Sequence, residues 1–168
     1  MRYLTIFAGI ALLFCSSALS AQPNNTNFAG NWKFDSAKSV GRYVPAKDLR
    51  ILPRTLKIKQ SYKKLVMDGF LTDPNDGSTL MEQMAFRLDG RKSLNDNDSL
   101  FNVSHAKWSD NGNKLTITTE TTRLFQDRKY SYKEVEVLSL EHGNLVVDVK
   151  YDNPYSERKY EAVYNRKS

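Results

Sequence analysis

Cysteine is almost absent from this chain, since Cys15 is the only thiol among 168 residues. It lies in an N-terminal segment that we expect to be removed. The mature chain would then have no disulfide, no thiolate nucleophile and no cysteine-based metal site. Small secreted animal domains usually carry cross-links, whereas a chain of this length can fold on its hydrophobic core alone.

Histidine is nearly as scarce, with His105 and His142 alone. His142 lies in an Glu-His-Gly-Asn turn, and two distant histidines do not make a zinc site. His105 shares a strand face with Phe101 and Val103, so it points inward if they do. The chain has no Gly-x-Ser-x-Gly elbow, phosphate-binding glycine loop or His-Glu-x-x-His motif. We therefore predict no catalytic residue, no metal and no cofactor.

Long apolar runs are missing except at the N-terminus. Arg2 precedes an apolar stretch at 6–14, and small residues follow at 16–21. This order is typical of a secretory signal peptide, and the apolar stretch is too short to span a bilayer. Cys15 could suggest a lipid anchor, but bulky Phe14 precedes it where a lipobox has a small residue. We predict cleavage near Ala21, export to the bacterial periplasm or medium, and no transmembrane segment in the mature chain.

The charge is basic but not concentrated. The 25 lysines and arginines are interleaved with 19 acidic residues, with no run of five like charges, for a net charge of +6. A nucleic-acid surface would gather its cations in one stripe, so we expect no nucleic-acid partner. Removing 21 residues from 168 leaves 147, which suits one domain over 22–168, expected to be a monomer.

From residue 54 onward, short alternating segments are separated by turns rich in glycine, asparagine and aspartate. No segment has convincing helical periodicity. The alternation predicts an all-β fold of eight to ten strands. They are expected at 31–35, 54–62, 65–71, 80–88, 101–108, 114–125, 130–140, 145–151 and 158–166.

Short turns between most of these strands indicate an antiparallel meander, and an up-and-down barrel hides the edge strands of a meander. A sandwich is the alternative, but its long crossovers are hard to find here. The one long irregular segment, 36–53, could cross a barrel mouth, with a single helical turn at 46–51. Segments 108–118 and 138–149 repeat one hairpin pattern, through either duplication or convergent turn chemistry.

The mature chain opens with Phe28-x-Gly30-x-Trp32, directly before the first expected strand. A Gly-x-Trp start followed by a β-meander resembles the lipocalins and fatty-acid-binding proteins, together the calycins. The resemblance implies that Phe28, Gly30 and Trp32 close the narrow end of the barrel. It also implies a basic residue of the last strand across the Trp32 ring, either Arg166 or Arg158. The chain lacks the helix pair of fatty-acid-binding proteins and is similar to a divergent lipocalin-like group.

Several polar residues are in register with apolar ones on the later strands, and a barrel of this size can hold a small ligand. We predict a non-catalytic carrier whose lumen binds a small hydrophobic or amphipathic molecule. Two alternatives remain: the polar residues pair among themselves or are turned outward by bulges, and a filled barrel serves as a protein-interaction or structural module of the periplasm or envelope. The candidate ligand residues are Glu82, His105, Arg123, Tyr164 and Arg166.

Overall fold

The structure, a computed structural model, describes residues 25–40, 53–71, 80–96, 100–125, 128–153 and 156–167. This part of the chain contains ten strands and no helix, which confirms the all-β prediction. The expected leader at 1–21 and the helical turn at 46–51 lie outside the described residues. The strands are β1 (Gly30–Phe34), β2 (Thr55–Gln60), β3 (Lys64–Phe70), β4 (Leu80–Arg87), β5 (Ser93–Leu94), β6 (Leu100–Trp108), β7 (Leu115–Phe125), β8 (Arg128–Glu141), β9 (Asn144–Asn153) and β10 (Ser156–Arg166).

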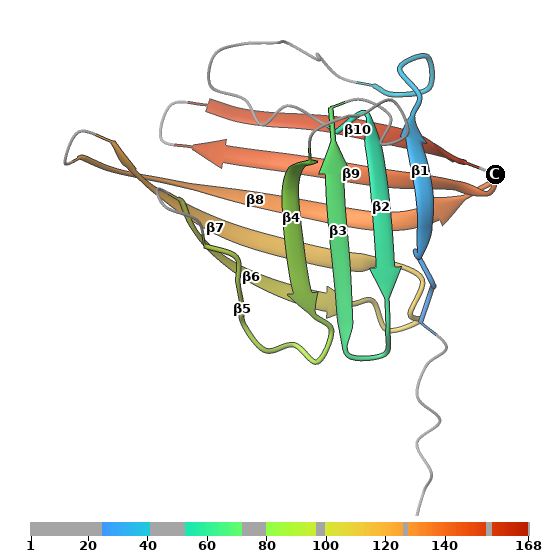
Figure 1. The fold of residues 1–168 in the computed structure, drawn as a ribbon, viewed down its shortest axis with the longest axis horizontal. Helices are drawn as coiled ribbons and strands as arrows, with labels where there is room; N and C mark the ends of the chain where they lie inside the picture. The colour runs from blue at the N-terminus through green and yellow to red at the C-terminus, as the bar shows by residue number, and fades with distance from the viewer. Residues whose placement is uncertain are drawn as a thin grey trace, which may run out of the picture.

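All ten strands belong to one antiparallel sheet that curls into a nearly closed barrel. Their order is β4-β3-β2-β1-β10-β9-β8-β7-β6-β5, so every neighbouring pair except β1 and β10 is also consecutive in sequence. In Figure 1 the strands β1–β4 stand in front, and β6–β10 pass behind them in a crossing direction. The two parts of the sheet therefore cover each other's apolar side, and the predicted up-and-down barrel is confirmed.

Strand β2 shows how the sequence selects this geometry. Leu56 and Ile58 are buried, whereas Lys57 and Lys59, which alternate with them along the strand, are exposed. Because successive side chains of a strand point to opposite faces, this alternation produces one apolar and one charged face. Burying a side chain such as Leu56 or Ile58 stabilises the fold by about 1.5–3 kcal/mol, which fixes the face that turns inward.

The turn between β8 and β9 follows from its sequence as well. Glu141 pairs with Asn144, which leaves only His142 and Gly143 in the loop. Both have positive φ angles, 51° and 82°. Two such residues form the turn whose twist matches that of the flanking strands in a hairpin. His142 is thus an exposed turn residue, as its sequence context predicts.

β4 and β5 are the two ends of the sheet, and no backbone ladder joins them. Side chains of the β5 region close the barrel there instead. β5 lies in a region that the sequence predicts as a loop. The Asn95 amide acts as a substitute peptide group: the Ala85 N–H donates to Asn95 Oδ1 (2.8 Å), and Asn95 Nδ2 donates to the Ala85 carbonyl (3.1 Å). Beside it, the Arg87 N–H donates to Ser93 Oγ at 2.7 Å. These bonds cover backbone groups that would otherwise form an open edge.

A charged turn follows β4. Asp89 lies between Arg87 and Arg91, and both guanidinium groups donate to its carboxylate, at 2.8 Å from Arg87 Nη2 and 2.6 Å from Arg91 Nη2. The hydrogen bond from Arg87, followed by that from Arg91, holds the pKa of Asp89 far below its usual range. The turn is solvent-exposed, so this geometry orders the chain more than it stabilises the fold.

The turn after β1 is fastened to the last strand. The Asp35 carboxylate accepts from the Ala37 N–H (3.0 Å) and from the Asn165 amide (2.8 Å), and the Asn165 bond is the main reason that the pKa of Asp35 is lowered. Ser39 Oγ donates to the Asp35 carbonyl and accepts from the Val163 N–H at 3.0 Å. The polar residues after Phe34 therefore hold β1 and β10 together.

Candidate functional site

One end of the barrel is closed by aromatic packing around Trp32. Its side chain is 1% exposed, and its ring N–H donates to the Phe28 carbonyl at 2.9 Å. Phe28 stacks on Trp108 with ring centroids 5.8 Å apart and only 4° between the ring planes. A buried Trp N–H that has found an acceptor is the arrangement expected of a structural residue.

Arg166 lies across the outer side of this end. It pairs with Trp32 in the ladder between β1 and β10, and its Cζ lies 5.3 Å from the centre of the Trp32 ring. Its Nη2 also donates to the Ala29 carbonyl at 2.9 Å. Gly30 lies beside both side chains, and its φ of 153° is a backbone conformation that residues with a side chain rarely adopt. The geometry is the one that the calycin resemblance implies.

The barrel interior next to Trp32 is apolar. Residues from six further strands pack there against the aromatic end and are almost fully buried. We call this part of the hydrophobic core cluster, next to Trp32, the closed half. Its members besides Phe28 and Trp32 include Ile58, Leu65, Phe86, Leu115, Leu138 and Leu145.

The other half of the interior carries polar side chains. We define the polar belt as the inward-facing, buried polar residues of β6–β9: Ser104, Thr119, Thr121, Glu134, Glu136 and Tyr151. Four of them form a row across the sheet, because Ser104 pairs with Thr119, Thr119 with Glu134, and Glu134 with Tyr151. Residues directly opposite in neighbouring strands have side chains on the same face. The row therefore crosses the interior wall from β6 to β9.

Hydrogen bonds and ring contacts order the polar belt. The hydroxyls of Ser104 and Thr119 lie 2.9 Å apart and share a hydrogen bond. Thr121 Oγ1 donates to Asn102 Oδ1 at 2.7 Å. On β8 and β9, the rings of Tyr132 and Tyr151 meet with centroids 4.9 Å apart. Hydroxyl, amide, carboxylate and phenol groups thus line a single wall.

The two buried glutamates are functional candidates that the sequence did not reveal. Within Glu-Val-Glu-Val the valines look like the inward residues, yet Glu134 and Glu136 are 4% and 7% exposed. Leu138 fixes the register, because it packs in the closed half and pairs with Leu115 and Val147. Positions two and four residues before it must share its face. The alternation of strand faces, counted back from the apolar Leu138, could have identified Glu134 and Glu136 as inward-facing.

The position of His105 differs from the one predicted for it as a candidate ligand residue. The sequence places it on the inward face with Phe101 and Val103, but His105 is exposed and Ser104 and Ala106 on either side of it are buried. Trp108 sets the register of β6 by packing against the core, and alternation then brings Ala106 and Ser104 inward. The prediction that His105 faces the interior is wrong.

The other four candidates lie apart from one another in the barrel. Arg166 is at the closed end, and Tyr164 is buried in the core, where its hydroxyl donates to the Pro53 carbonyl at 3.2 Å. Glu82 is half-buried opposite Gly69 on β3. Arg123 is exposed at the rim beyond the polar belt, paired with Tyr130. The structure therefore does not bring the predicted residues together.

Arg158 also lies on the polar side of the interior, since it pairs with Tyr151 of the belt. The alternative that Arg158 rather than Arg166 covers Trp32 is therefore wrong. With Arg123 on β7 and Arg158 on β10, exposed cations stand at the rim on the same strand faces as the belt.

Two searches of the described residues gave no candidate. They contain no group of three or more histidine, cysteine, aspartate or glutamate side chains arranged to hold a metal ion. Among the same residues, no helix is long and apolar enough to cross a membrane. Comparisons of the chain with protein families, with curated proteins and with solved structures gave no match.

Proposed function

We propose that this chain is an exported, non-catalytic binding protein that holds a small amphipathic molecule in the barrel interior. One observation carries the proposal: the interior is divided into an apolar closed half and a half lined by the polar belt. Ligand sites combine apolar walls with a few well-placed polar groups. The division matches a molecule that has an apolar part and a hydrogen-bonding head.

The chemistry of the belt favours a particular kind of head group. Glu134 and Glu136 place two carboxyl groups on one wall, with the hydroxyls of Ser104, Thr119 and Thr121 beside them. Carboxylates accept hydrogen bonds, and hydroxyls both donate and accept them. A head that carries hydroxyl, amide or amine groups can form hydrogen bonds with such a wall, whereas a second carboxylate would be repelled. The proposed ligand is therefore neutral or cationic at its polar end.

The positions of the histidines support a binding role over a catalytic one. The sequence has two histidines and, beyond Cys15, no cysteine. His105 is on the outer surface and His142 is in the exposed β8–β9 turn. Histidine and cysteine are thus absent from the described part of the wall that would contact the ligand, and Ser104 has no imidazole on its own face of β6 to act as its base.

Two neighbouring threonines provide a matched test. Thr121 is buried in the belt, whereas Thr122 points to the opposite face and shares a hydroxyl contact with Ser131. The purified protein would be extracted with organic solvent to identify co-purified lipids, and titrated with dansyl-labelled undecanol and undecanoic acid. We expect Thr121→Val and Glu134→Gln each to weaken undecanol binding about tenfold, the equivalent of one hydrogen bond. Thr122→Val should change it less than twofold.

Two results would contradict the proposal. One is the absence of both co-purified lipid and probe binding in a protein that is folded by circular dichroism. The other is an equal effect of Thr121→Val and Thr122→Val, which would place the probe outside the barrel. Tighter binding of undecanoic acid than of undecanol would contradict only the inferred head group.

A filled barrel that serves as an interaction or structural module is the second candidate. The observation in its favour is the size of the fully buried side chains, since Trp32, Tyr164, Phe28 and Phe86 all lie inside. Aromatic side chains of this kind fill a small barrel efficiently. A stably folded protein that binds no probe would favour this candidate.

A further inference from the structure

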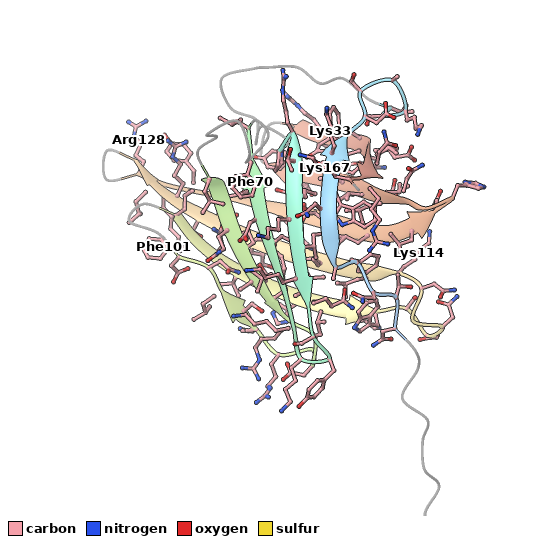
Figure 2. The ribbon with its side chains drawn as sticks, turned by 45° about the vertical axis from the view of Figure 1, so that its right-hand side comes forward. Lys33, Phe70, Phe101, Lys114, Arg128 and Lys167 are labelled. Carbon is pink, nitrogen blue, oxygen red and sulfur yellow. The ribbon has the colours of Figure 1, made fainter. Side chains whose placement is uncertain are left out.

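The far ends of β6, β7 and β8 form a projecting tip, which we define as residues 100–101, 123–124 and 128–130. In Figure 1 the β7–β8 hairpin extends to the left well beyond β4 and the other front strands. Figure 2 shows Phe101 and Arg128 at the same end of the molecule, away from Lys114. The ladder between β7 and β8 continues to Phe125 and Arg128, so the two strands stay paired to their ends.

Both faces of the tip combine apolar and basic side chains. On one face, Arg123 pairs with Leu100 on β6 and with Tyr130 on β8. On the other face, Leu124 pairs with Lys129, and Phe101, which pairs with Thr122, is its diagonal neighbour. A hairpin with one face on a core would carry apolar residues on that face only. The composition of the tip therefore does not follow from packing within the barrel.

The apolar side chains of the tip are exposed to solvent. Phe101 is 43% exposed, Leu124 49% and Tyr130 40%. Single exposed apolar residues are common, but a group of them at one projecting end indicates a contact surface.

The charge of the tip identifies the kind of surface. In the β7–β8 hairpin, residues 122–131 contain Arg123, Arg128 and Lys129 against the single acid Asp127, a net charge of +2, while the Asp96 carboxylate on the β6 side accepts from the Asn102 N–H at 3.0 Å. Cations attract anionic lipid head groups, while apolar and aromatic side chains enter the boundary between head groups and acyl chains. Long basic side chains can extend to the head groups while their neighbours insert. We propose that this tip docks the protein on anionic lipid membranes, an inference that does not depend on the proposed function.

Vesicle co-sedimentation of the purified protein tests the proposal. We expect binding to phosphatidylcholine vesicles that contain about 30% phosphatidylglycerol, little binding to phosphatidylcholine alone, and weaker binding as salt rises from about 50 to about 300 mM. Arg128→Glu with Lys129→Glu should reduce partitioning by about 30-fold or more, from about 1 kcal/mol per lost cation. Phe101→Ser with Leu124→Ser should reduce it by about tenfold while retaining the salt dependence.

The β2–β3 turn supplies the matched control. It carries Tyr62, which is 78% exposed, beside Lys63 and Lys64. We expect Lys63→Glu with Lys64→Glu, and separately Tyr62→Ser, to change partitioning less than threefold. Equal losses from the two charge reversals would mean that the overall basic charge, and not the tip, attracts the vesicles, and would overturn the proposal. Absence of vesicle binding, or binding unchanged by both tip variants, would overturn it as well.

Discussion

Replacing Trp32 by alanine tests whether this residue closes the barrel. Its side chain is 1% exposed, so the substitution removes almost the whole ring from a packed site. An aromatic side chain of this size buries roughly 200 Å², which at about 25 cal/mol per Å² amounts to about 5 kcal/mol. Measured losses for buried Trp and Phe are about 3–5 kcal/mol. The Phe28 carbonyl also loses the hydrogen bond it accepts at 2.9 Å. We expect a loss of about 4–5 kcal/mol.

Such a loss can exceed the stability of a small domain, so a milder variant is needed. Trp32→Phe keeps a ring in the site but removes the indole N–H and part of the volume. We expect it to lower the free energy of unfolding by about 1.5–2.5 kcal/mol. Urea unfolding followed by far-ultraviolet circular dichroism measures both variants without relying on the fluorescence of the residue replaced. Thr122→Val, on the outer face, serves as the control and should change stability by less than about 0.5 kcal/mol.

The Arg166 contact can be separated from the packing by a double-mutant cycle. Arg166 lies over the ring and is exposed, so the expected coupling with Trp32 is about 0.5–1 kcal/mol. A loss below about 1.5 kcal/mol for Trp32→Ala would refute the reasoning, because it would mean that the ring does not fill the end of a closed barrel. The Phe28-x-Gly30-x-Trp32 motif would then have no structural meaning here.

Two further predictions concern the seam and the turn beside it. Asn95→Ala removes both side-chain bonds to Ala85, so we expect a loss of about 1–3 kcal/mol and faster hydrogen exchange at the Ala85 amide; unchanged exchange would show that the seam does not depend on Asn95. Because Arg87 lowers the pKa of Asp89, the stabilisation from this carboxylate is complete above its unfolded pKa of about 3.9 and is lost as the pH falls below it. An NMR titration should give a midpoint below the ordinary value that moves upward in Arg87→Gln, and an ordinary midpoint in the unsubstituted protein would contradict the ion pair.

The candidate site was only partly predictable. Tyr164 and Glu82 are in register with large apolar residues and are at least half-buried, but neither belongs to the polar belt. His105 was misplaced because Phe101 and Val103 suggested the wrong inner face, while the true inner face of β6 carries the small residues Ser104 and Ala106. A shift of one residue moves every side chain of a strand to the other face. Near a barrel mouth, the size of the apolar side chains therefore does not reliably predict which face of a strand points inward.

The class of fold follows from patterns along the chain. Alternating strands such as β2, and turn pairs such as His142-Gly143, act through local sterics and through the burial of one face, which are both readable from neighbouring residues. The Phe28-x-Gly30-x-Trp32 start likewise predicts its own position, since a glycine and a large ring suit the place where the chain enters the barrel.

The meeting of the polar groups depends on contacts between strands that are distant in sequence. Glu134 is brought into line with Thr119 and Tyr151 by pairing between strands, and Asn95 completes the seam with a strand ten residues earlier. The register of β8 is set by the packing of Leu138 in the closed half, and it cannot be predicted from the local strand propensity of β8. The position of the β7–β8 tip beyond the front strands is decided in the same way, because it depends on the lengths of strands that are distant in sequence.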